Sequence, residues 1–468
     1  MLTLSQAGKG LKQDFTSVLE KLRKLGASYG EIRAQKNNNT FIAVRDGQVE
    51  SITLATEMGA AIRVLAENAW GFSTTNSLEQ NNLERSASSA LKMARAAGKS
   101  VREPVKLAPA KAVEDEVTVS VKKDPREVDI ATKTSNLLTI NKDCFNFDKR
   151  IKSVTINYAD LATEQTLATT DGTFIAQEKM FVWNYCWVTG KSNGIMASAR
   201  DETGAHGYEL FDVEFPEKIA ERVSKKVTQQ LEAKTLKSGL HPAVIGTNIV
   251  GVLAHEALGH ICEADLALSG SAVMGKIGEK IASEKVTIFD SALIPQGFGA
   301  IKYDDEGVQG QKTLLIHDGV LLGFMHNRET AGKMGVEPTG NARAQDFRFP
   351  PLIRMRNTCL EKGDYAFEEL LEDIQFGYFL EAFRGGQANL DGTFTVGVQS
   401  AFKIVKGELG HPVRNAGISG NTLETLRQVD ACGKDFGLGV GRCGKGQQMF
   451  QSNGGPPMRV KGILIGGA

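Results

Sequence analysis

The chain has 468 residues, of which 41% are hydrophobic and 24% charged, and its 55 basic and 55 acidic residues give a formal net charge of zero. This balance argues against a general nucleic-acid binder or a membrane-surface binder, and no apolar run is long enough to span a bilayer. The length suits two or three domains with a large core. The 50 glycines predict many tight turns and a strand-rich architecture.

The six cysteines form no C-x-x-C pair, which argues against a zinc ribbon or a thioredoxin motif. The opening residues lack the apolar core of a signal peptide. We therefore expect a cytoplasmic protein whose cysteines are reduced.

The first part of the chain predicts two helices on either side of a set of hairpins. Residues 11–25 and 77–98 have helical periodicity, and a glycine ends each stretch. Between them, residues 28–74 predict strands joined by tight turns, with an Asp-Gly hairpin signal at 46–47. Residues 101–126 are charged and contain three prolines, which indicates an extended connection over the surface.

The next part repeats this alternation of helix and strand. The expected elements are a helix over 125–143, several strands over 151–211 with an Asp-Gly turn at 171–172, and an amphipathic helix over 215–235. Residues 237–239 then form a plausible domain boundary, and a short strand over 241–245 begins a second domain.

The second domain is mostly strand and turn after residue 285. A hairpin is expected around Asp318-Gly319, a strand pair over 392–413 and a final strand over 459–467. Residues 264–283 are rich in glycine and serine, so we expect a mobile loop there.

One stretch of this second domain carries chemistry. Thr247 is a good N-cap for a helix whose apolar run, 249–254, leads directly into the sequence HEALGH at 255–260. The stretch predicts a buried helix that carries two imidazoles and a carboxylate. Burying such groups is costly unless they are paired, and a metal ion would pair them.

The spacing of the two histidines needs a distorted helix. They are at i and i+5, whereas the usual zinc-peptidase helix, H-E-x-x-H, has them at i and i+4. At about 100° per residue they lie roughly 140° apart on an ideal α-helix, too far round to share one ion. A π-type widening would bring them together, and Gly259 permits one. The alternative is a helix end at which His255, Glu256 and His260 are satisfied by hydrogen bonds.

A catalytic zinc usually has three protein ligands and one open position, so this helix needs a third donor from elsewhere. Cys443 stands out because it lies in the glycine-rich segment 437–446, where Arg442 and Lys445 would stabilise its thiolate. On spacing alone, a buried free cysteine in a turn is the more common case. The other candidate donors are Cys262, Glu263, Asp265, His317, His326, His411 and Cys432.

Two phosphate-binding patterns in the same segment are rejected. Residues 439–444 fit G-x-G-x-x-G, but a dinucleotide fold needs a βαβ unit and an acidic residue further on, and too little chain remains. Residues 439–445 fit G-x-x-x-x-G-K, but Gly446 stands where Ser or Thr must hold magnesium. The polar clusters at 304–307 and 339–341 are assigned to turns.

Taken together, the motifs resemble the TldD/PmbA family of zinc metallopeptidases, and in particular its TldD-type, metal-bearing members. The resemblance is dense over the second half of the chain, whereas the first half matches in layout only. An HExxxH box combined with a late CGK loop is more specific than either motif alone. The motifs are HEALGH at 255–260, DDEGVQGQ at 304–311, PTGNAR at 338–343, GGQANLDGTF at 385–394, ISGNTLETL at 418–426, GVGRCGKGQ at 439–447 and the GILIGG ending.

The resemblance implies a role for each site residue. His255 and His260 would be the two imidazole ligands of Zn²⁺, and Cys443 would be the third ligand instead of a free cysteine. Glu256 would be the general base. The PmbA-type relatives lack this metal box, whereas this sequence keeps every one of these residues.

We accordingly expect an α+β protein with two domains. An N-terminal mixed α/β domain over 1–238 would supply the peptide-binding cleft and the dimer contacts. A strand-rich, β-barrel-like C-terminal domain over 239–468 would be the metallopeptidase domain and would carry the metal helix.

The predicted function is a zinc-dependent peptidase for unfolded or flexible peptides, with metal-activated water and Glu256 as the base. Family members form dimers, so the chain is expected to pair with itself or with a metal-free PmbA-type relative and to hold extended peptides by strand addition. One alternative is a non-catalytic peptide-binding or assembly protein whose structural zinc has a fourth ligand among Cys262, Glu263 and Asp265. A weaker alternative is a zinc hydrolase that acts on a non-peptide amide.

Overall fold

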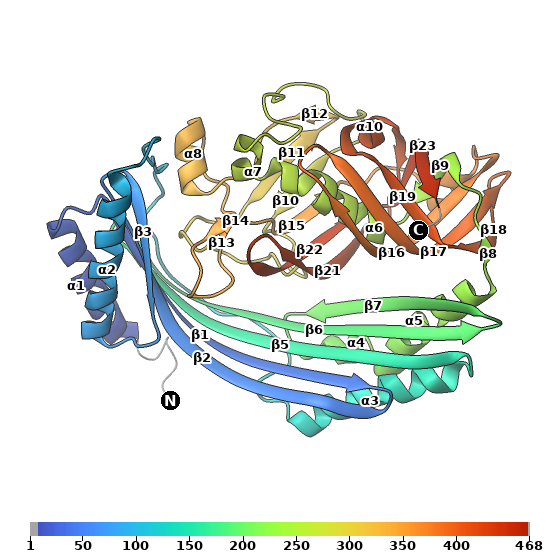
Figure 1. The fold of residues 1–468 in the computed structure, drawn as a ribbon, viewed down its shortest axis with the longest axis horizontal. Helices are drawn as coiled ribbons and strands as arrows, with labels where there is room; N and C mark the ends of the chain where they lie inside the picture. Colours follow the sequence, from blue (N-terminus) through green and yellow to red (C-terminus); the bar gives the residue numbers. More distant parts are fainter. Residues whose placement is uncertain (1–7, 467–468) are drawn as a thin grey trace.

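Figure 1 shows the computed structural model, which describes residues 8–466. A long curved sheet built from the first half of the chain lies beneath a strand-rich second half. Among the described residues, no helix is both long and apolar enough to cross a membrane.

The N-terminal sheet is built from long antiparallel hairpins. Its strands follow the order β3-β2-β1-β5-β6-β4, and β7 also pairs with β6. The expected turn at 46–47 is present, with positive φ angles of 48° at Asp46 and 81° at Gly47, as a tight hairpin turn requires. The strands are β1 (Tyr29–Arg45), β2 (Gln48–Ala66), β3 (Ala69–Thr75), β4 (Glu114–Val117), β5 (Ile151–Thr169), β6 (Phe174–Ser192) and β7 (Ile195–Ala205).

Helices pack on this sheet in two groups. The helices α1 (Gly8–Lys24) and α2 (Gln80–Gly98) share a core with the β1–β2 hairpin near one end of the sheet. The helices α3 (Ile130–Phe147) and α5 (Pro216–Glu232), with the short α4 (Leu210–Val213), cover the face turned away from the second half of the chain. The opposite face of the sheet is therefore left to meet the C-terminal half.

The expected helices are all present, although α3 begins later than predicted. Its first residue is Ile130, because the Asp129 side chain accepts the Thr132 N–H and caps the helix there. The predicted surface connection over 101–126 contains one short strand, β4, which pairs in parallel with β6.

The C-terminal half contains a closed five-stranded barrel. The strands β16, β9, β23, β19 and β17 pair in that order, and a direct β16–β17 pairing closes the ring. Their bounds are β9 (Gly239–Ile245), β16 (Phe376–Ala388), β17 (Thr393–Val405), β19 (Ala416–Asn421) and β23 (Met458–Gly466), and the attached strands are β8 (Lys234–Thr235), β18 (Glu408–Arg414) and β20 (Val429–Cys432). The α+β fold class with a strand-rich, barrel-containing second half is thereby confirmed.

A second sheet of the C-terminal half lies beside the barrel. Its order is β12-β11-β10-β15-β22-β21, so β21 is an edge strand. The bounds are β10 (Ile288–Ser291), β11 (Lys312–His317), β12 (Val320–Leu321), β15 (Asn357–Leu360), β21 (Gly437–Gly444) and β22 (Gln448–Gly455), with a separate pair β13 (Ala342–Arg343) and β14 (Leu352–Ile353). The short helices are α6 (Thr247–Val252), α7 (Ala264–Leu268), α8 (Arg328–Met334), α9 (Phe367–Leu371) and α10 (Thr422–Arg427).

Helix α6 is packed between these two sheets. It contacts β16 of the barrel on one side and β22 of the second sheet on the other. Its residues Ile249 and Val250 belong to the main core of the C-terminal half. The chain that follows α6 is thus held rigidly at the junction between the barrel and β21–β22.

The two halves of the chain are joined by buried charges on the loop 304–306. Asp305 accepts from Lys179 Nζ at 2.9 Å and from Gln165 Nε2 at 2.8 Å. Glu306 accepts from Arg63 Nη2 at 2.6 Å. The assignment of this cluster to a simple turn was therefore incomplete, because its side chains point into the sheet as ion-pair partners.

Candidate metal centre

The segment after α6 has the distorted geometry that its sequence requires. Leu253–Gly259 forms a π-helical turn, and the N–H of His260 bonds the carbonyl of His255, five residues back. The widening places the His255 and His260 rings 5.2 Å apart, centroid to centroid. A Cβ on Gly259 would lie only 2.1 Å from Met355 Sδ, so a side chain does not fit at this turn.

Four side chains converge at this turn. The ligand atoms of His255, Glu256, His260 and Cys443 all lie within 4.8 Å of one another. His260 Nε2 is 3.3 Å from Cys443 Sγ, and a Glu256 oxygen is 3.8 Å from each imidazole Nε2. Within residues 8–466, this is the one group of three or more such side chains that is close enough to hold a metal ion.

His255 is buried without a hydrogen-bond partner. It is 1% exposed, and neither Nδ1 nor Nε2 has a protein partner. Burial, with the charges of His260 and Arg354 nearby, holds the pKa of His255 well below its ordinary value, so the ring is neutral. A neutral imidazole with a free nitrogen is the form that binds a metal, and an unpaired buried polar group is otherwise costly.

His260 is oriented by a carboxylate behind it. Its Nδ1 lies 2.9 Å from Glu263 Oε2, which leaves Nε2 directed toward Cys443. Burial by itself would lower the pKa of His260, but its bonds to Cys443 and Glu263 overcome this and raise the pKa to about 10. A carboxylate on the far ring nitrogen is how metal-binding histidines are commonly fixed in one tautomer and orientation.

Lys445 links the two parts of the chain that meet at the centre. Its Nζ lies 3.2 Å from Glu263 Oε2, 2.8 Å from both oxygens of Asp265 and 3.1 Å from the carbonyl of Ile353. Glu263 is wholly buried, so this cation compensates a charge that would otherwise be costly. The histidine segment and the Cys443 segment are therefore fastened together independently of any metal.

Cys443 reaches the centre from the edge strand β21. The Arg354 guanidinium donates to the carbonyls of Cys443 and Gln447, both at 2.7 Å. These bonds hold the β21–β22 hairpin against the π-helical turn and keep the buried Sγ close to His260.

Glu256 is the most open of the four side chains. It is 34% exposed, compared with 18% for His260 and 1% for His255. Burial nevertheless raises its pKa above the ordinary value for a glutamate. The centre is thus closed on the histidine side and accessible on the carboxylate side.

The sequence of the chain matches three models of one protein family. Family models described as PmbA/TldA metallopeptidase domain 1, central domain and C-terminal domain match residues 30–94, 123–231 and 238–467. The chain belongs to the PmbA/TldD metallopeptidase family. All four converging residues lie within the match to the C-terminal domain.

Curated relatives in this family carry metalloprotease names. A metalloprotease of Methanocaldococcus jannaschii is 37% identical over 94% of this chain and 98% of its own length. A zinc metalloprotease TldD homolog of Saccharolobus solfataricus is 31% identical over 96% of this chain and 99% of its own. The solved structure of TldE from Thermococcus kodakarensis has the same fold, with a TM-score of 0.79 and 23% identity over 97% of this chain and all of that one.

In this PmbA/TldD chain the other candidate donors lie outside the group of four. Cys262 is buried in the core and burial raises the pKa of its thiol. Asp265 is held by Lys445, and Glu263 contacts the far nitrogen of His260.

The more distant candidate donors have other partners or lie apart from the group. His326 Nδ1 is 3.1 Å from Thr330 Oγ1, and Cys432 Sγ donates to the carbonyl of Lys285 at 3.3 Å. Neither His317, which is exposed, nor His411 joins the group.

The sequence did not predict the contacts of two residues at the centre. Glu263 was considered only as a ligand, although its i+3 spacing from His260 places it one turn further along the chain. Arg354 is separated from Cys443 by too much sequence for any spacing argument to connect them.

Proposed function

We propose that the chain is a zinc-dependent peptidase that hydrolyses peptide bonds in unfolded or flexible peptides. The observation that carries this proposal is the convergence of two imidazoles, one thiol and one carboxylate. One of the imidazoles, that of His255, is buried and has no hydrogen-bond partner in the protein. The metalloprotease names of the relatives support it.

The donor set suits zinc in both chemistry and distance. Zinc prefers nitrogen and sulfur ligands in tetrahedral sites. From bond lengths of about 2.0 Å to nitrogen and about 2.3 Å to sulfur, neighbouring donors in such a site lie roughly 3.3–3.7 Å apart. The 3.3 Å between His260 Nε2 and Cys443 Sγ matches this spacing. His255, His260 and Cys443 would therefore be the three ligands.

The remaining chemistry depends on Glu256. When bound, zinc would supply Lewis acidity, which lowers the pKa of water and polarises a carbonyl group. Glu256 follows a ligand directly in sequence and faces the open side of the centre. Its carboxylate would accept the proton of the attacking water and then deliver it to the leaving amine. Lys445 and Glu263 would keep His260 in place during this exchange.

The edge strand β21 offers a place for an extended substrate. It is the last strand of its sheet, and its residues Arg442 and Gly444 are exposed on either side of Cys443. A peptide that paired with this edge would bond backbone to backbone, which tolerates many side-chain sequences but requires an unfolded chain. Its scissile bond would then lie beside Cys443.

Replacing Glu256 by Gln tests the assigned mechanism. The variant should keep its zinc and lose about 10²–10⁴-fold in kcat/KM on a flexible peptide, because the proton acceptor is gone. Glu424→Gln, at an exposed site on α10, is the matched control and should behave as the parent.

Two results would speak against this mechanism. A zinc-bearing Glu256→Gln chain that cleaved peptides at the parental rate would contradict the role of Glu256. Zinc in the parent without cleavage of any peptide would favour a peptide-binding protein with a structural zinc.

We also propose that the chain forms a dimer, with itself or with a metal-free PmbA-type relative. β3 pairs only with residues 60–66 of β2, so the outer edge of β2 from Gln48 to Gly59 has no partner strand among the described residues. Ile52 and Leu54 on this segment are exposed apolar side chains. Open edges with apolar residues favour pairing with another chain.

Light scattering tests the dimer. The parent, measured alone and mixed with a PmbA-type relative, should form a dimer in at least one of the two samples, and Leu54→Lys should weaken that dimer. A parent that stays monomeric in both samples would contradict this proposal.

A further inference from the structure

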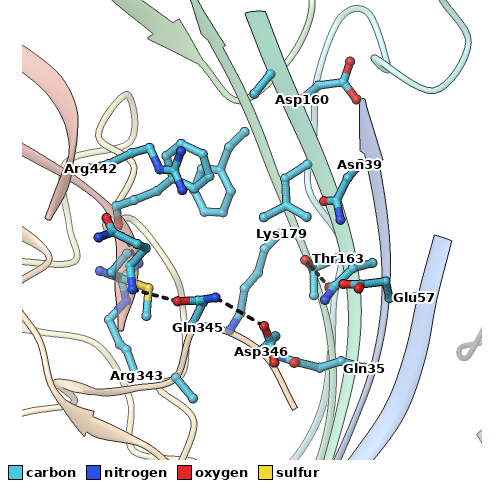
Figure 2. Close-up of a pocket in the computed structure, with 18 of the residues that line it drawn as sticks. Gln35, Asn39, Glu57, Asp160, Thr163, Lys179, Arg343, Gln345, Asp346 and Arg442 are labelled. Atoms are coloured by element: carbon cyan, nitrogen blue, oxygen red, sulfur yellow. Dashed lines mark hydrogen bonds between the residues drawn. The ribbon is translucent and has the colours of Figure 1, made fainter. Parts of the chain in front are cut away.

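A cavity lies between the N-terminal sheet and the tip of the β21–β22 hairpin. Its volume is about 290 Å³, close to the roughly 300 Å³ lower limit for ligand pockets, so it suits a side chain or chain end rather than a whole cofactor. Figure 2 shows polar side chains of β1 and β5 on one wall, Arg343, Gln345 and Arg442 on the other, and Lys179 between them.

The acidic side chains of this cavity already have partners. Arg348 pairs with Glu57 at 3.0 Å and with Asp346 at 2.9 Å. Lys179 pairs with Asp305 at 2.9 Å. The fourth acid that lines the cavity, Asp160, pairs at 2.6 Å with a buried lysine behind the sheet, Lys133.

Two cations of the cavity have no carboxylate partner among the described residues. Arg343 is 4% exposed and donates only to the carbonyls of Met355 and Phe450, both at 2.8 Å. Arg442 is exposed, and its guanidinium lies 5.4 Å from the centre of the Phe450 ring. Neither arginine forms an ion pair among the described residues; Asp305 and Asp290 act on Arg343, and Glu202 acts on Arg442, only at longer range.

Arg343 is an unfavourable place for an uncompensated charge. Burial lowers its pKa to about 9, and the charges of Arg356 and Arg354 act in the same direction, while the more distant Asp305 and Asp290 oppose them only in part. An anion in the cavity would relieve both effects, because it would restore solvation and offset the like charges.

A buried hydrogen-bond acceptor lies on the opposite wall. Gln35 is 3% exposed, its Nε2 donates to Gln165 at 2.7 Å, and its Oε1 has no partner. A bound peptide would bring N–H donors as well as an anion to a polar wall of this kind, whereas a halide or sulfate would bring no donor.

The cavity is close to the metal centre but on the other face of β21. Arg442 and Cys443 are consecutive residues of that strand, so their side chains point to opposite faces. A peptide paired with the edge of β21 alternates in the same way. When one of its residues faces the centre at Cys443, the next residue faces Arg442 and the cavity.

We propose that the cavity is a subsite for a carboxylate of the bound peptide, at a position next to the scissile bond, with Arg343 and Arg442 as the contacting groups. This inference rests on the proposed peptidase function. The carboxylate has two sources in a peptide, an Asp or Glu side chain and the free C-terminus, and both present the same chemistry to the two arginines.

Cleavage of matched peptides tests the subsite. The zinc-loaded protein is given unfolded peptides with acetylated and amidated ends, in which one neutral Gln is replaced by Glu at each position in turn. A charge-assisted contact predicts that Glu raises kcat/KM about tenfold at a single position. A parallel set with free C-termini distinguishes the sources, since a terminal carboxylate predicts about tenfold faster cleavage of the free acids than of the amides.

Substitution of Arg442 assigns the effect to the cavity. This residue is exposed, so Arg442→Gln should fold, and it should bring the Glu/Gln ratio of kcat/KM close to one. Arg427→Gln, exposed on α10 and not in the cavity wall, should keep the parental ratio. Cleavage of neutral peptides with a ratio near one at every position, and equal rates for acids and amides, would overturn the subsite while leaving the peptidase proposal standing.

A binding measurement decides the case in which no peptide is cleaved. Fluorescein-labelled peptides with one Glu or the matching Gln are titrated with the parent and with Arg442→Gln, and anisotropy reports the dissociation constants. About tenfold tighter binding of a Glu peptide, lost in the variant, would support the subsite. Equal constants for both peptides would overturn it.

Discussion

Two buried polar clusters in the C-terminal half differ in how well their groups are paired. On the loop 304–306, each carboxylate has several hydrogen-bond donors. Asp304 accepts backbone N–H groups from three residues. Asp305 accepts from Lys179, Gln165 and the Ala344 N–H, and Glu306 accepts from Arg63 and the Arg328 N–H. In the segment 255–263, neither nitrogen of His255 has a partner and Glu263 Oε1 also lacks one.

The difference is the one expected between a structural cluster and the proposed ligand site. Most buried polar groups in folded proteins are hydrogen-bonded, so an unpaired one needs an explanation. The 304–306 loop is complete as it stands and holds the two halves of the chain together. The 255–263 segment leaves the nitrogens of His255 unpaired, and the proposed metal ion would pair one of them.

Breaking the complete cluster should have the largest effect on folding. Burial alone would raise the pKa of Asp305, but Lys179 and Arg33 overcome this and hold it well below its ordinary value. Asp305→Asn removes the anion that compensates the half-buried Lys179 and the buried Arg33. We therefore expect a loss of about 3 kcal/mol in the free energy of unfolding, measured by chemical denaturation. Asp364→Asn, at an exposed site, is the control and should change stability by less than about 0.5 kcal/mol.

The same variant makes a prediction about pH. Because the pKa of Asp305 is depressed in the folded state, its contribution is fully present above the unfolded pKa of about 3.9 and is lost as pH falls below that value toward the folded pKa. The stability difference between the parent and Asp305→Asn should therefore be constant from about pH 5 to 7 and shrink below about pH 4. A difference that grew on acidification would show that Asp305 is protonated in the native protein.

Weakening the support behind His260 should have a smaller effect, and on zinc rather than on folding. Glu263→Gln removes the charge that fixes the His260 ring and binds Lys445. We expect a 10–100-fold loss in zinc affinity, about 1.4–2.7 kcal/mol, measured by competition with a chelator. Glu361→Gln, whose parent carboxylate pairs with Lys312 at the surface, should keep the parental affinity. Unchanged affinity in Glu263→Gln would remove Glu263 from the positioning of His260.

Removing the unpaired group should have the smallest effect on stability, and it should be favourable. In the zinc-free protein, His255→Leu replaces a buried imidazole without hydrogen bonds by an apolar side chain, so unfolding should cost about 1 kcal/mol more. Thermal unfolding of both metal-free proteins measures this. A destabilisation of several kcal/mol would mean that His255 has a structural partner in solution and that the contrast between the two clusters is wrong.

The sequence predicted the parts of this molecule that depend on local rules. The i, i+5 spacing of His255 and His260, with Gly259 between them, predicted a π-type turn for a shared metal site. The turn is present, and Met355 leaves no room for a side chain at Gly259. The Asp-Gly turns at 46–47 and 318–319 were predictable in the same way, since both residues of each have a positive φ, whereas at 171–172 only Gly172 does.

The parts that depend on distant pairing could not be predicted from spacing. Cys443 reaches His260 only because β21 pairs with β22 and Arg354 holds their hairpin against the turn. The closure of the barrel by β16 and β17 and the ion pairs of Asp305 with the N-terminal sheet are likewise long-range contacts. The family resemblance implied the role of Cys443, whereas nothing in the sequence indicated that Glu263 and Lys445 would connect the two segments.

If His255, His260 and Cys443 hold one zinc ion, as proposed, elemental analysis of the purified protein should find about one zinc per chain in the parent and little or none in Cys443→Ala. Full retention of zinc in Cys443→Ala would contradict the assigned ligands, and a parent that bound no zinc when supplied with it would contradict the metal centre itself.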